Sequence, residues 1–356
     1  MNSPDSVISG SQSSPIKLKH IKAHRSIPTA SLQTLIKPLR TRLVQPGKPL
    51  PAGSQKLEVP NSIQSDHEVK EYCIENVWIY DISLKHAAGE SAPTNTRRDS
   101  KHHRLLYFAG GSFQSPPSNN HWKFLSKLVK ELHPTYVITV VSYPLAPNSP
   151  APSSLPVLET LLRTILQQAA QDSVPITLAG DSSGGNIAIS LALKAVPSIN
   201  HHLEGAQSQT LSSMGEGGTP LRNVLLISPV LDMRCTNPQI SEADKHDPVL
   251  SASYIEDVAK TWSANLPRDD PAVSPLLADL TPLKRAGVKV HGVLGTFDVL
   301  APDADLFRER LESVGVEGEW LVWEKQMHCF PLAWHYGLEE SVRGVEWVVD
   351  VLKRNA

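Results

Sequence analysis

The chain has 356 residues, of which 40% are hydrophobic and 20% charged, and its formal net charge is -2. This composition is typical of a globular protein, and the length fits one large α/β domain or two smaller ones. Three scattered cysteines predict no disulfide framework and favour a reducing compartment, so we expect a cytoplasmic protein. No apolar run approaches the ~18 residues that a membrane-spanning helix needs, and the N-terminus does not resemble a secretory signal.

The N-terminal part of the chain is basic. Residues 6–57 contain no acidic residue but nine lysines and arginines. Residues 1–15 are rich in Ser and Pro and are predicted to be disordered, and residues 28–43 predict a short helix interrupted at Pro38. The simplest interpretation is a solvated surface; a targeting role and contact with an anionic membrane are left open. Nucleic-acid binding is not expected, because the basic stretch lacks aromatic residues and a reading helix.

Further along, strands and helices alternate. Strands are predicted at residues 71–84, 104–111, 136–143, 175–180, 223–231, 289–297 and 317–324. Helices are predicted at residues 121–132, 154–170, from 186, 306–314 and 339–354. This alternation predicts an α/β fold with a mostly parallel central sheet flanked by helices.

Two segments lie outside the alternation, residues 1–60 and residues 232–275. We expect both to contribute to a small helical cap over the carboxyl edge of the sheet, where α/β folds bind ligands. The main domain is then 61–356, with the cap insertion near 232–275. Polar loops are predicted at 89–103 and 204–220.

A serine lies at a predicted strand-to-helix turn. Gly180-Asp181-Ser182-Ser183-Gly184 fits G-x-S-x-G, with a strand before it and a helix after it. In so sharp a turn, side chains two positions either side of the nucleophile would collide with neighbouring elements, so glycine is needed there. Ser182 meets this condition and Ser183 does not. Ser182 is therefore the predicted nucleophile, and the Ser183 N–H is placed to face an oxyanion; the alternative is an ordinary glycine-rich turn.

A serine nucleophile needs a base and an orienting acid, which this type of fold supplies in the order Ser, Asp, His. Of the fourteen histidines, only His328 follows the last predicted strand and precedes the last helix. Asp298 directly follows a strand and is the predicted acid, with Asp232 as the alternative. Asp303 and Asp305 lie near a helix start and are expected to stabilise that terminus.

A second source of oxyanion donors is expected in "YFAGGSF". The small residues Gly110, Gly111 and Ser112 let backbone N–H groups approach the serine turn. A simple strand-to-helix turn is the alternative interpretation.

Together these motifs resemble the hormone-sensitive-lipase-like branch of the α/β-hydrolases, the carboxylesterase group. The resemblance runs from about residue 72 to 352 and includes "GDSSGGNIA", "YPLAPNSPAP", "GTFDVLAPDADLFRERL" and "MHCFPLAW". It implies an α/β-hydrolase fold in which Ser182 is the nucleophile, Asp298 the orienting acid and His328 the base. It also implies that the oxyanion donors are the N–H groups of Gly111, Ser112 and Ser183.

Two positions depart from the family pattern. The usual His-Gly-Gly-Gly is here Ala109-Gly110-Gly111-Ser112. Losing the histidine removes a polar anchor for the loop, and the serine crowds the acyl or alcohol pocket. We therefore expect Ala109→His to raise turnover.

The expected activity is hydrolysis of small to medium, apolar carboxylic esters through an acyl-enzyme, without cofactor or metal. Cleavage of an amide, formamide or lactone by the same triad stays open, as does a non-catalytic small-molecule receptor on the same fold. Trp262, Tyr254 and Phe113 could line the pocket, but aromatic residues at helical spacing are more often core. Homodimerisation is also left open. Relatives of this family often act on secondary metabolites or xenobiotics, which the resemblance suggests as a role.

Overall fold

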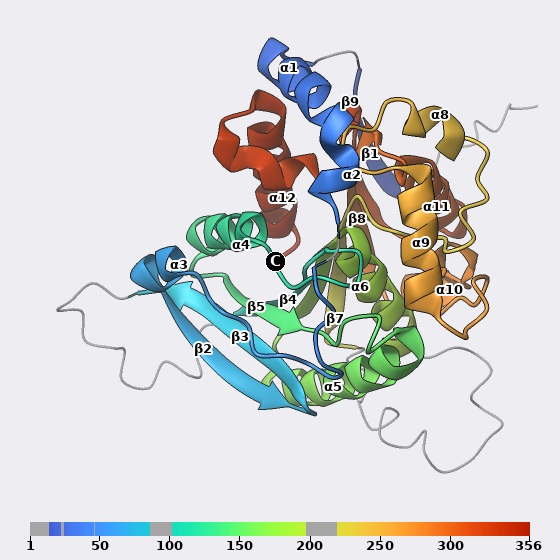
Figure 1. Cartoon of the computed structure of the whole chain (residues 1–356). Helices are drawn as coiled ribbons and strands as arrows, with labels where there is room; N and C mark the ends of the chain where they lie inside the picture. Colours follow the sequence, from blue (N-terminus) through green and yellow to red (C-terminus); the bar gives the residue numbers. More distant parts are fainter. Residues whose placement is uncertain (1–13, 23–24, 46, 86–101, 197–218) are drawn as a thin grey trace, which may run out of the picture.

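The computed structural model of the protein describes residues 14–22, 25–45, 47–85, 102–196 and 219–356. In these residues a nine-stranded sheet runs through the molecule in the order β1-β9-β8-β7-β6-β4-β5-β3-β2 (Figure 1). The strands are β1 (Ile16–Ile21), β2 (His67–Ile74), β3 (Val77–Leu84), β4 (His103–Phe108), β5 (Tyr136–Ser142), β6 (Ile176–Asp181), β7 (Leu221–Ile227), β8 (Lys289–Phe297) and β9 (Gly318–Met327). All neighbours pair in parallel except β2 with β3 and β3 with β5. The predicted mostly parallel sheet is confirmed.

One predicted strand is in fact a hairpin. The segment expected to be one strand over residues 71–84 forms β2 and β3, which pair antiparallel. The turn between them consists of Glu75 and Asn76, whose φ angles are 50° and 60°. A two-residue hairpin turn with both φ values positive matches the twist of the flanking strands, and Asn tolerates it well. The single-strand prediction was wrong because this turn signal lies inside an otherwise strand-like run.

The edge strand β1 was not predicted. It pairs in parallel with β9, with Ile16 opposite Gly318. Of its six residues only Ile16 is buried. Apolar and polar residues alternate only over residues 16–19, and so short an alternation is a weak strand signal.

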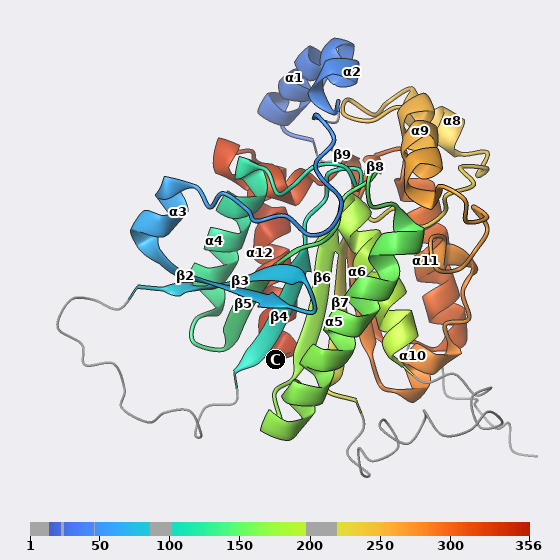
Figure 2. The same ribbon diagram turned by 60° about the horizontal axis from the view of Figure 1, so that its bottom comes forward.

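Two helical layers cover the sheet (Figures 1 and 2). One face carries α4 (Asn119–Leu132) and α12 (Glu339–Arg354), and the other carries α5 (Ala151–Asp172), α6 (Ser182–Ala195) and α11 (Ala301–Val314). Each layer encloses its own cluster of buried side chains, so the strands between them are apolar on both faces. Helix α6 begins at Ser182 itself, four residues before the predicted start.

Helices from two distant segments lie together at one end of the molecule (Figure 2). The first set is α1 (Ile27–Ile36), a 3-10 turn (Lys37–Leu39) and α2 (Arg40–Leu43); the second is α8 (Ile240–Asp244) and α9 (Ala252–Ser263). Helix α1 ends before Pro38, as predicted. Arg40 joins the two sets, since one guanidinium nitrogen lies 3.2 Å from an Asp244 carboxylate oxygen and donates to the Asp244 carbonyl.

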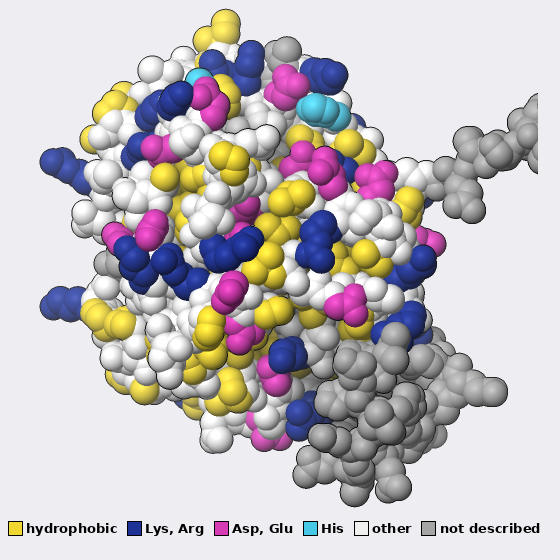
Figure 3. Space-filling view, turned by 90° about the vertical axis from the view of Figure 1, so that its right-hand side faces the viewer, with side chains coloured by type: hydrophobic (Ala, Val, Ile, Leu, Met, Phe, Trp, Pro, Cys, Tyr) yellow, Lys and Arg dark blue, Asp and Glu magenta, His cyan; other side chains and the backbone are white. Residues whose placement is uncertain are grey.

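The remaining elements are short: α3 (Asn61–Asp66), α10 (Thr281–Arg285) and 3-10 turns at Pro275–Leu277 and Phe330–Tyr336. The polar loops predicted at 89–103 and 204–220 lie almost wholly outside the described residues, as does most of 1–15. On the face shown in Figure 3, charged side chains of both signs are interspersed with hydrophobic ones. None of the described helices is both long and apolar enough to cross a membrane.

Candidate active site

The predicted nucleophile lies in a strained turn between β6 and α6. Ser182 has a φ of 51°, a left-handed conformation that is uncommon for residues other than glycine. A Cβ on Gly184 would lie 1.9 Å from the carbonyl oxygen of Phe108, and one on Gly180 would lie 2.4 Å from the carbonyl oxygen of Gly184. The two glycines around Ser182 are therefore required by packing, for the reason inferred from the sequence.

The predicted base and acid are hydrogen-bonded to each other. His328 follows β9 and Asp298 follows β8, and His328 Nδ1 lies 2.8 Å from Asp298 Oδ2. The other Asp298 oxygen accepts from the Leu300 backbone N–H at 2.9 Å, which fixes the carboxylate. Burial is the largest single influence and by itself would lower the pKa of His328, but the charge of Asp298 and the contacts with Asp298 and Cys329 together hold that pKa well above its usual value of 6.5.

The alternative acids have other partners. Asp232 is buried and forms an ion pair with Arg234, with 2.7 Å between the closest atoms. Asp303 accepts from the side-chain amide of Asn237, and Asp305 pairs with Arg308 in the same helix. The geometry therefore selects Asp298 as the partner of the histidine.

Ser182 and His328 line one cavity of about 690 Å³. In the described residues no hydrogen bond joins their side chains. Instead, His328 Nε2 lies 3.4 Å from Cys329 Sγ. Burial raises the pKa of the Cys329 thiol to about 12, so the thiol stays protonated at neutral pH. Hydrogen bonds between catalytic groups are often long in the absence of substrate and tighten in its presence.

The loop after β4 approaches the serine turn as predicted. Gly110, Gly111 and Ser112 all line the same cavity as Ser182. Ser112 has a φ of 57°, and its hydroxyl accepts a hydrogen bond from the Tyr254 hydroxyl at 2.9 Å. Ser183, the third expected donor, occupies the first turn of α6 beside the nucleophile.

This loop is anchored without a histidine at position 109. The Gly110 N–H donates to Asp181 Oδ1 at 2.9 Å, and the Ala109 carbonyl accepts from the Tyr143 hydroxyl at 2.7 Å. Ala109 itself is 1% exposed and belongs to the apolar core below the loop. This packing removes the physical reason for expecting Ala109→His to raise turnover.

Asp181, next to the nucleophile, is the centre of a buried network that the sequence analysis missed. Besides Gly110, it accepts from the Tyr107 hydroxyl at 2.7 Å and contacts His121 Nε2 at 3.1 Å. Burial alone would raise the pKa of Asp181, but His121 and these hydrogen bonds lower it, so the group is a carboxylate. The only signal in the sequence is the acidic residue inside G-x-S-x-G.

A second buried carboxylate, Asp247 of the cap, supports the acid loop. Its Oδ2 accepts from the Val299 N–H at 2.9 Å, directly after Asp298 in the chain. Its Oδ1 accepts from the N–H groups of Val249 and Leu250 at 2.7 and 2.9 Å. Burial and the charge of Asp298 raise the pKa of Asp247 to about 7. The spacing of these residues in the sequence gives no signal from which this contact could be predicted.

Of the three aromatic candidates, two belong to the core. Phe113 and Trp262 are fully buried and stack on each other, with ring centroids 4.2 Å apart. Only Tyr254 lines the cavity.

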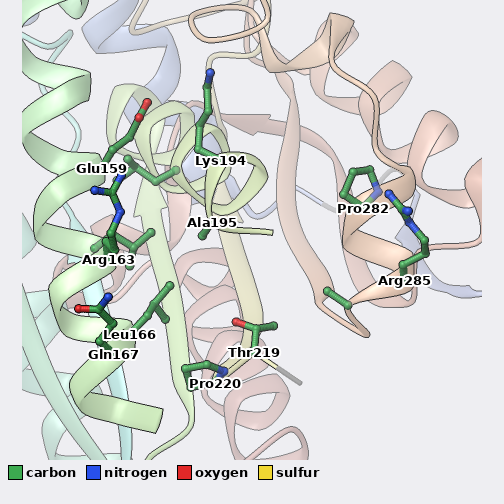
Figure 4. A pocket seen from close by; sticks show the side chains of 13 residues that line it. Glu159, Arg163, Leu166, Gln167, Lys194, Ala195, Thr219, Pro220, Pro282 and Arg285 are labelled. Carbon is green, nitrogen blue, oxygen red and sulfur yellow. The ribbon is translucent and has the colours of Figure 1, made fainter. Parts of the chain in front are cut away.

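The rest of the cavity wall is largely apolar. Its apolar residues come from the N-terminal segment (Leu32, Ile36, Leu43, Val44), the cap insertion (Val249, Leu250) and the end of β9 with the segment after it (Met327, Leu332, Ala333, Tyr336, Leu338). Polar side chains also line it, namely Gln45 and, around the start of α4, Ser115, Ser118, Asn120 and His121. A second cavity of about 400 Å³ lies between α5, α6 and α10 (Figure 4). None of the predicted catalytic residues lines it. In the described parts of the chain, no three His, Cys, Asp or Glu side chains converge as metal ligands would.

Comparison with known proteins identifies the family. The α/β-hydrolase fold family matches residues 105–332, which is more than half of the chain. The chain belongs to this family. The resemblance to the α/β-hydrolases and the fold class inferred from the sequence are thereby confirmed.

Relatives with known names are esterases and a lipase. "Esterase LipU" of Mycobacterium tuberculosis is 28% identical over 76% of this chain and 82% of its own length. An esterase of Acinetobacter venetianus is 28% identical over 60% of this chain, a match that spans 62% of that protein. Among solved structures, a mutant of the esterase E40 has a TM-score of 0.68 at 20% identity, covering 93% of this chain and 99% of that one. A hormone-sensitive lipase from a metagenome library has a TM-score of 0.63 at 18% identity, covering 92% and 94%; these two structures support the fold alone.

Proposed function

We propose that the protein is a serine carboxylesterase that hydrolyses small to medium, apolar esters through an acyl-enzyme. The observation that carries this proposal is the 2.8 Å hydrogen bond between His328 and Asp298 beside a cavity that also exposes Ser182. The names of the relatives, esterase and lipase, support the ester as the bond that is cleaved.

The proposed reaction begins with attack of Ser182 Oγ on the ester carbonyl. His328 takes the hydroxyl proton on Nε2, while Asp298 holds Nδ1–H and stabilises the imidazolium that forms. Nε2 must turn from the Cys329 thiol towards Ser182 as substrate binds. Because the thiol is protonated and neutral, it does not compete as a strong base or nucleophile.

The tetrahedral intermediate carries a negative charge on the former carbonyl oxygen. Backbone N–H groups of Gly111, Ser112 and Ser183 are the proposed donors to this oxygen. The Asp181 network holds the first two in place through Gly110. His328 then donates its proton to the leaving alcohol, and a water attacks the acyl-enzyme in the same way.

The apolar cavity wall favours an apolar acyl or alcohol group. Aliphatic side chains from the two cap segments face the cavity that contains Ser182. Burying apolar substrate against them stabilises the complex by about 0.8 kcal/mol per methylene. We therefore expect kcat/KM to rise with acyl length from acetate to medium chains.

Covalent labelling tests the proposed nucleophile. A fluorophosphonate should phosphonylate the protein once, and peptide mass spectrometry should locate the adduct on Ser182. Ser182→Ala should abolish labelling, whereas Ser183→Ala, which keeps the backbone N–H and loses only a hydroxyl, should be labelled like the wild type. An adduct on another residue, or equal labelling of Ser182→Ala, would refute the proposal.

A further inference from the structure

Two polar side chains of helix α1 face the protein. Thr29 and Gln33 are only 1% and 3% exposed. The Thr29 and Ser26 hydroxyls donate to the carboxylate of Glu340 in α12, and the Gln33 side-chain amide donates to the Lys325 carbonyl at 3.1 Å. These bonds to the body of the protein fix which side of α1 faces outwards.

Large aliphatic side chains consequently face solvent. Ile27 is 83% exposed, Leu35 71%, Leu39 45% and Leu43 51%. In the described residues these four are half of the eight strongly exposed large hydrophobic side chains, although they come from one short segment. We call them the apolar ridge. Single exposed apolar residues are normal on protein surfaces, but a gathering of them marks a site of contact.

The apolar ridge leads into the candidate active site. Leu43 is half exposed and also lines the cavity that contains Ser182. Tyr336, in the 3-10 turn after β9, is 63% exposed and is also a lining residue. Leu32 and Ile36 of α1 continue the apolar wall inwards. An apolar molecule held at the ridge therefore has an apolar route to the nucleophile.

The charge of this segment indicates what the ridge contacts. Between Ile27 and Leu43 the chain carries three cations, Lys37, Arg40 and Arg42, and no acidic residue. Arg40 is occupied in holding Asp244 of the cap, but Arg42 is exposed, and no described residue forms an ion pair with it. Aliphatic side chains flanked by cations suit the boundary between the headgroups and acyl chains of an anionic bilayer. A second copy of the chain fits less well, because a two-fold contact would bring two such cationic segments together.

We infer that the apolar ridge docks on an anionic lipid surface and delivers lipid-dissolved esters to the cavity. The delivery rests on the proposed esterase function, whereas the docking does not. In the docked state the ridge lies at the boundary between the lipid headgroups and the acyl chains. The part of the cavity lined by the exposed Leu43 and Tyr336 then faces the lipid.

Vesicle flotation tests the docking. The probes are vesicles of phosphatidylcholine alone and of phosphatidylcholine mixed with phosphatidylglycerol. The test variant is Ile27→Ser with Leu35→Ser, two ridge positions that do not line the cavity. The matched control is Tyr72→Ser with Leu306→Ser, which removes two exposed hydrophobic side chains elsewhere, 42% and 43% exposed.

The full-length protein should float with the anionic vesicles, less with the neutral ones, and less at high salt. The ridge variant should partition at least about tenfold more weakly than the wild type, because it loses apolar area that the lipid would bury. The control variant should partition like the wild type. No binding by the wild type, or equal loss in both variants, would overturn the inference. A wild-type dimer that becomes monomeric only in the ridge variant would assign the ridge to self-association and overturn it too.

Turnover separates the docking from the proposed function. Wild type and ridge variant should hydrolyse soluble p-nitrophenyl butyrate equally, while the ridge variant loses activity towards the same type of ester dissolved in anionic vesicles. Ser182→Ala should float like the wild type. Floating without turnover of any ester would refute the esterase function and leave docking supported. Turnover of the soluble ester without floating would refute the docking alone.

Discussion

At the scale of single residues, the pair formed by His328 and Asp298 predicts how the rate of hydrolysis depends on pH. The imidazole must be neutral to accept the proton of Ser182, and Asp298 and Cys329 together hold its pKa well above 6.5 against the opposing effect of burial. The acid limb of the profile of kcat/KM against pH should therefore have its inflection above pH 6.5. Asp298→Asn should move the inflection down and lower kcat by about 10³–10⁴-fold. An inflection at or below 6.5 in the wild type would contradict this electrostatic account.

Asp247 predicts a pH dependence of stability. Its pKa is raised from 3.8 to about 7, so between these values the folded protein holds a proton that the unfolded chain releases. Stability from this group is present at low pH and is lost as pH rises through about 7. Asp247→Asn removes the titration, so the difference in Tm, wild type minus variant, should fall as the pH rises from about 5 to about 8. Thermal denaturation at several pH values measures it, and a difference that stays constant from about pH 5 to about 8 would show that the three N–H donors keep Asp247 ionised throughout.

At the scale of elements, the turn between β6 and α6 requires its glycines. A Cβ at Gly184 would overlap the Phe108 carbonyl, so either β4 or α6 must move. Gly184→Ala should cost more than about 2 kcal/mol and lower Tm by at least about 2.5 °C in a chain of this length. Gly47→Ala is the control, since a Cβ there meets nothing within 4 Å. Equal Tm values for the two variants would show that the turn relaxes more easily than its geometry indicates.

Elements with a strong local signal in the sequence could be predicted, and elements with a weak one could not. Ser182, Asp298 and His328 could each be placed directly after a strand, because the strands are recognisable in the sequence and this type of fold supplies the three residues in this order. The sequence signal for β1 was too weak, since apolar and polar residues alternate only over residues 16–19. The hairpin between β2 and β3 was missed because strand propensity hides its two-residue turn.

Contacts between residues far apart in the chain could not be predicted from the sequence. His121 meets Asp181 sixty positions away, and Asp247 meets Val299 across the cap. Each of these bonds depends on where whole helices pack, not on local spacing. The exposure of Ile27 and Leu35 is of the same kind, because it follows from the docking of α1 on Glu340.

At the scale of the whole molecule, the cavity is closed by segments that are far apart in sequence. Leu43 and Val44 form its wall beside Val249 and Leu250, and Arg40 joins the two segments. Besides Asp244, Arg40 donates to the carbonyl groups of Asp247 and Leu250. The shape of the substrate site therefore depends on the contact between the N-terminal helices and the cap.

Arg40→Ala should loosen this contact. Removing these bonds should raise KM for medium-chain esters by about two- to tenfold and leave turnover of acetate esters nearly unchanged. Arg42→Ala is the matched control, because it removes a neighbouring arginine that has no ion-pair partner among the described residues. Steady-state kinetics over a series of acyl lengths gives the answer. Equal effects of both variants, or a loss independent of chain length, would contradict this role for Arg40.

The most direct test of the central claim is hydrolysis of p-nitrophenyl esters from acetate to decanoate by the wild type, Ser182→Ala and Ser183→Ala. The account predicts turnover that rises from acetate towards medium chains, disappears in Ser182→Ala and persists in Ser183→Ala. No turnover by the folded wild type, or full turnover by Ser182→Ala, would contradict it.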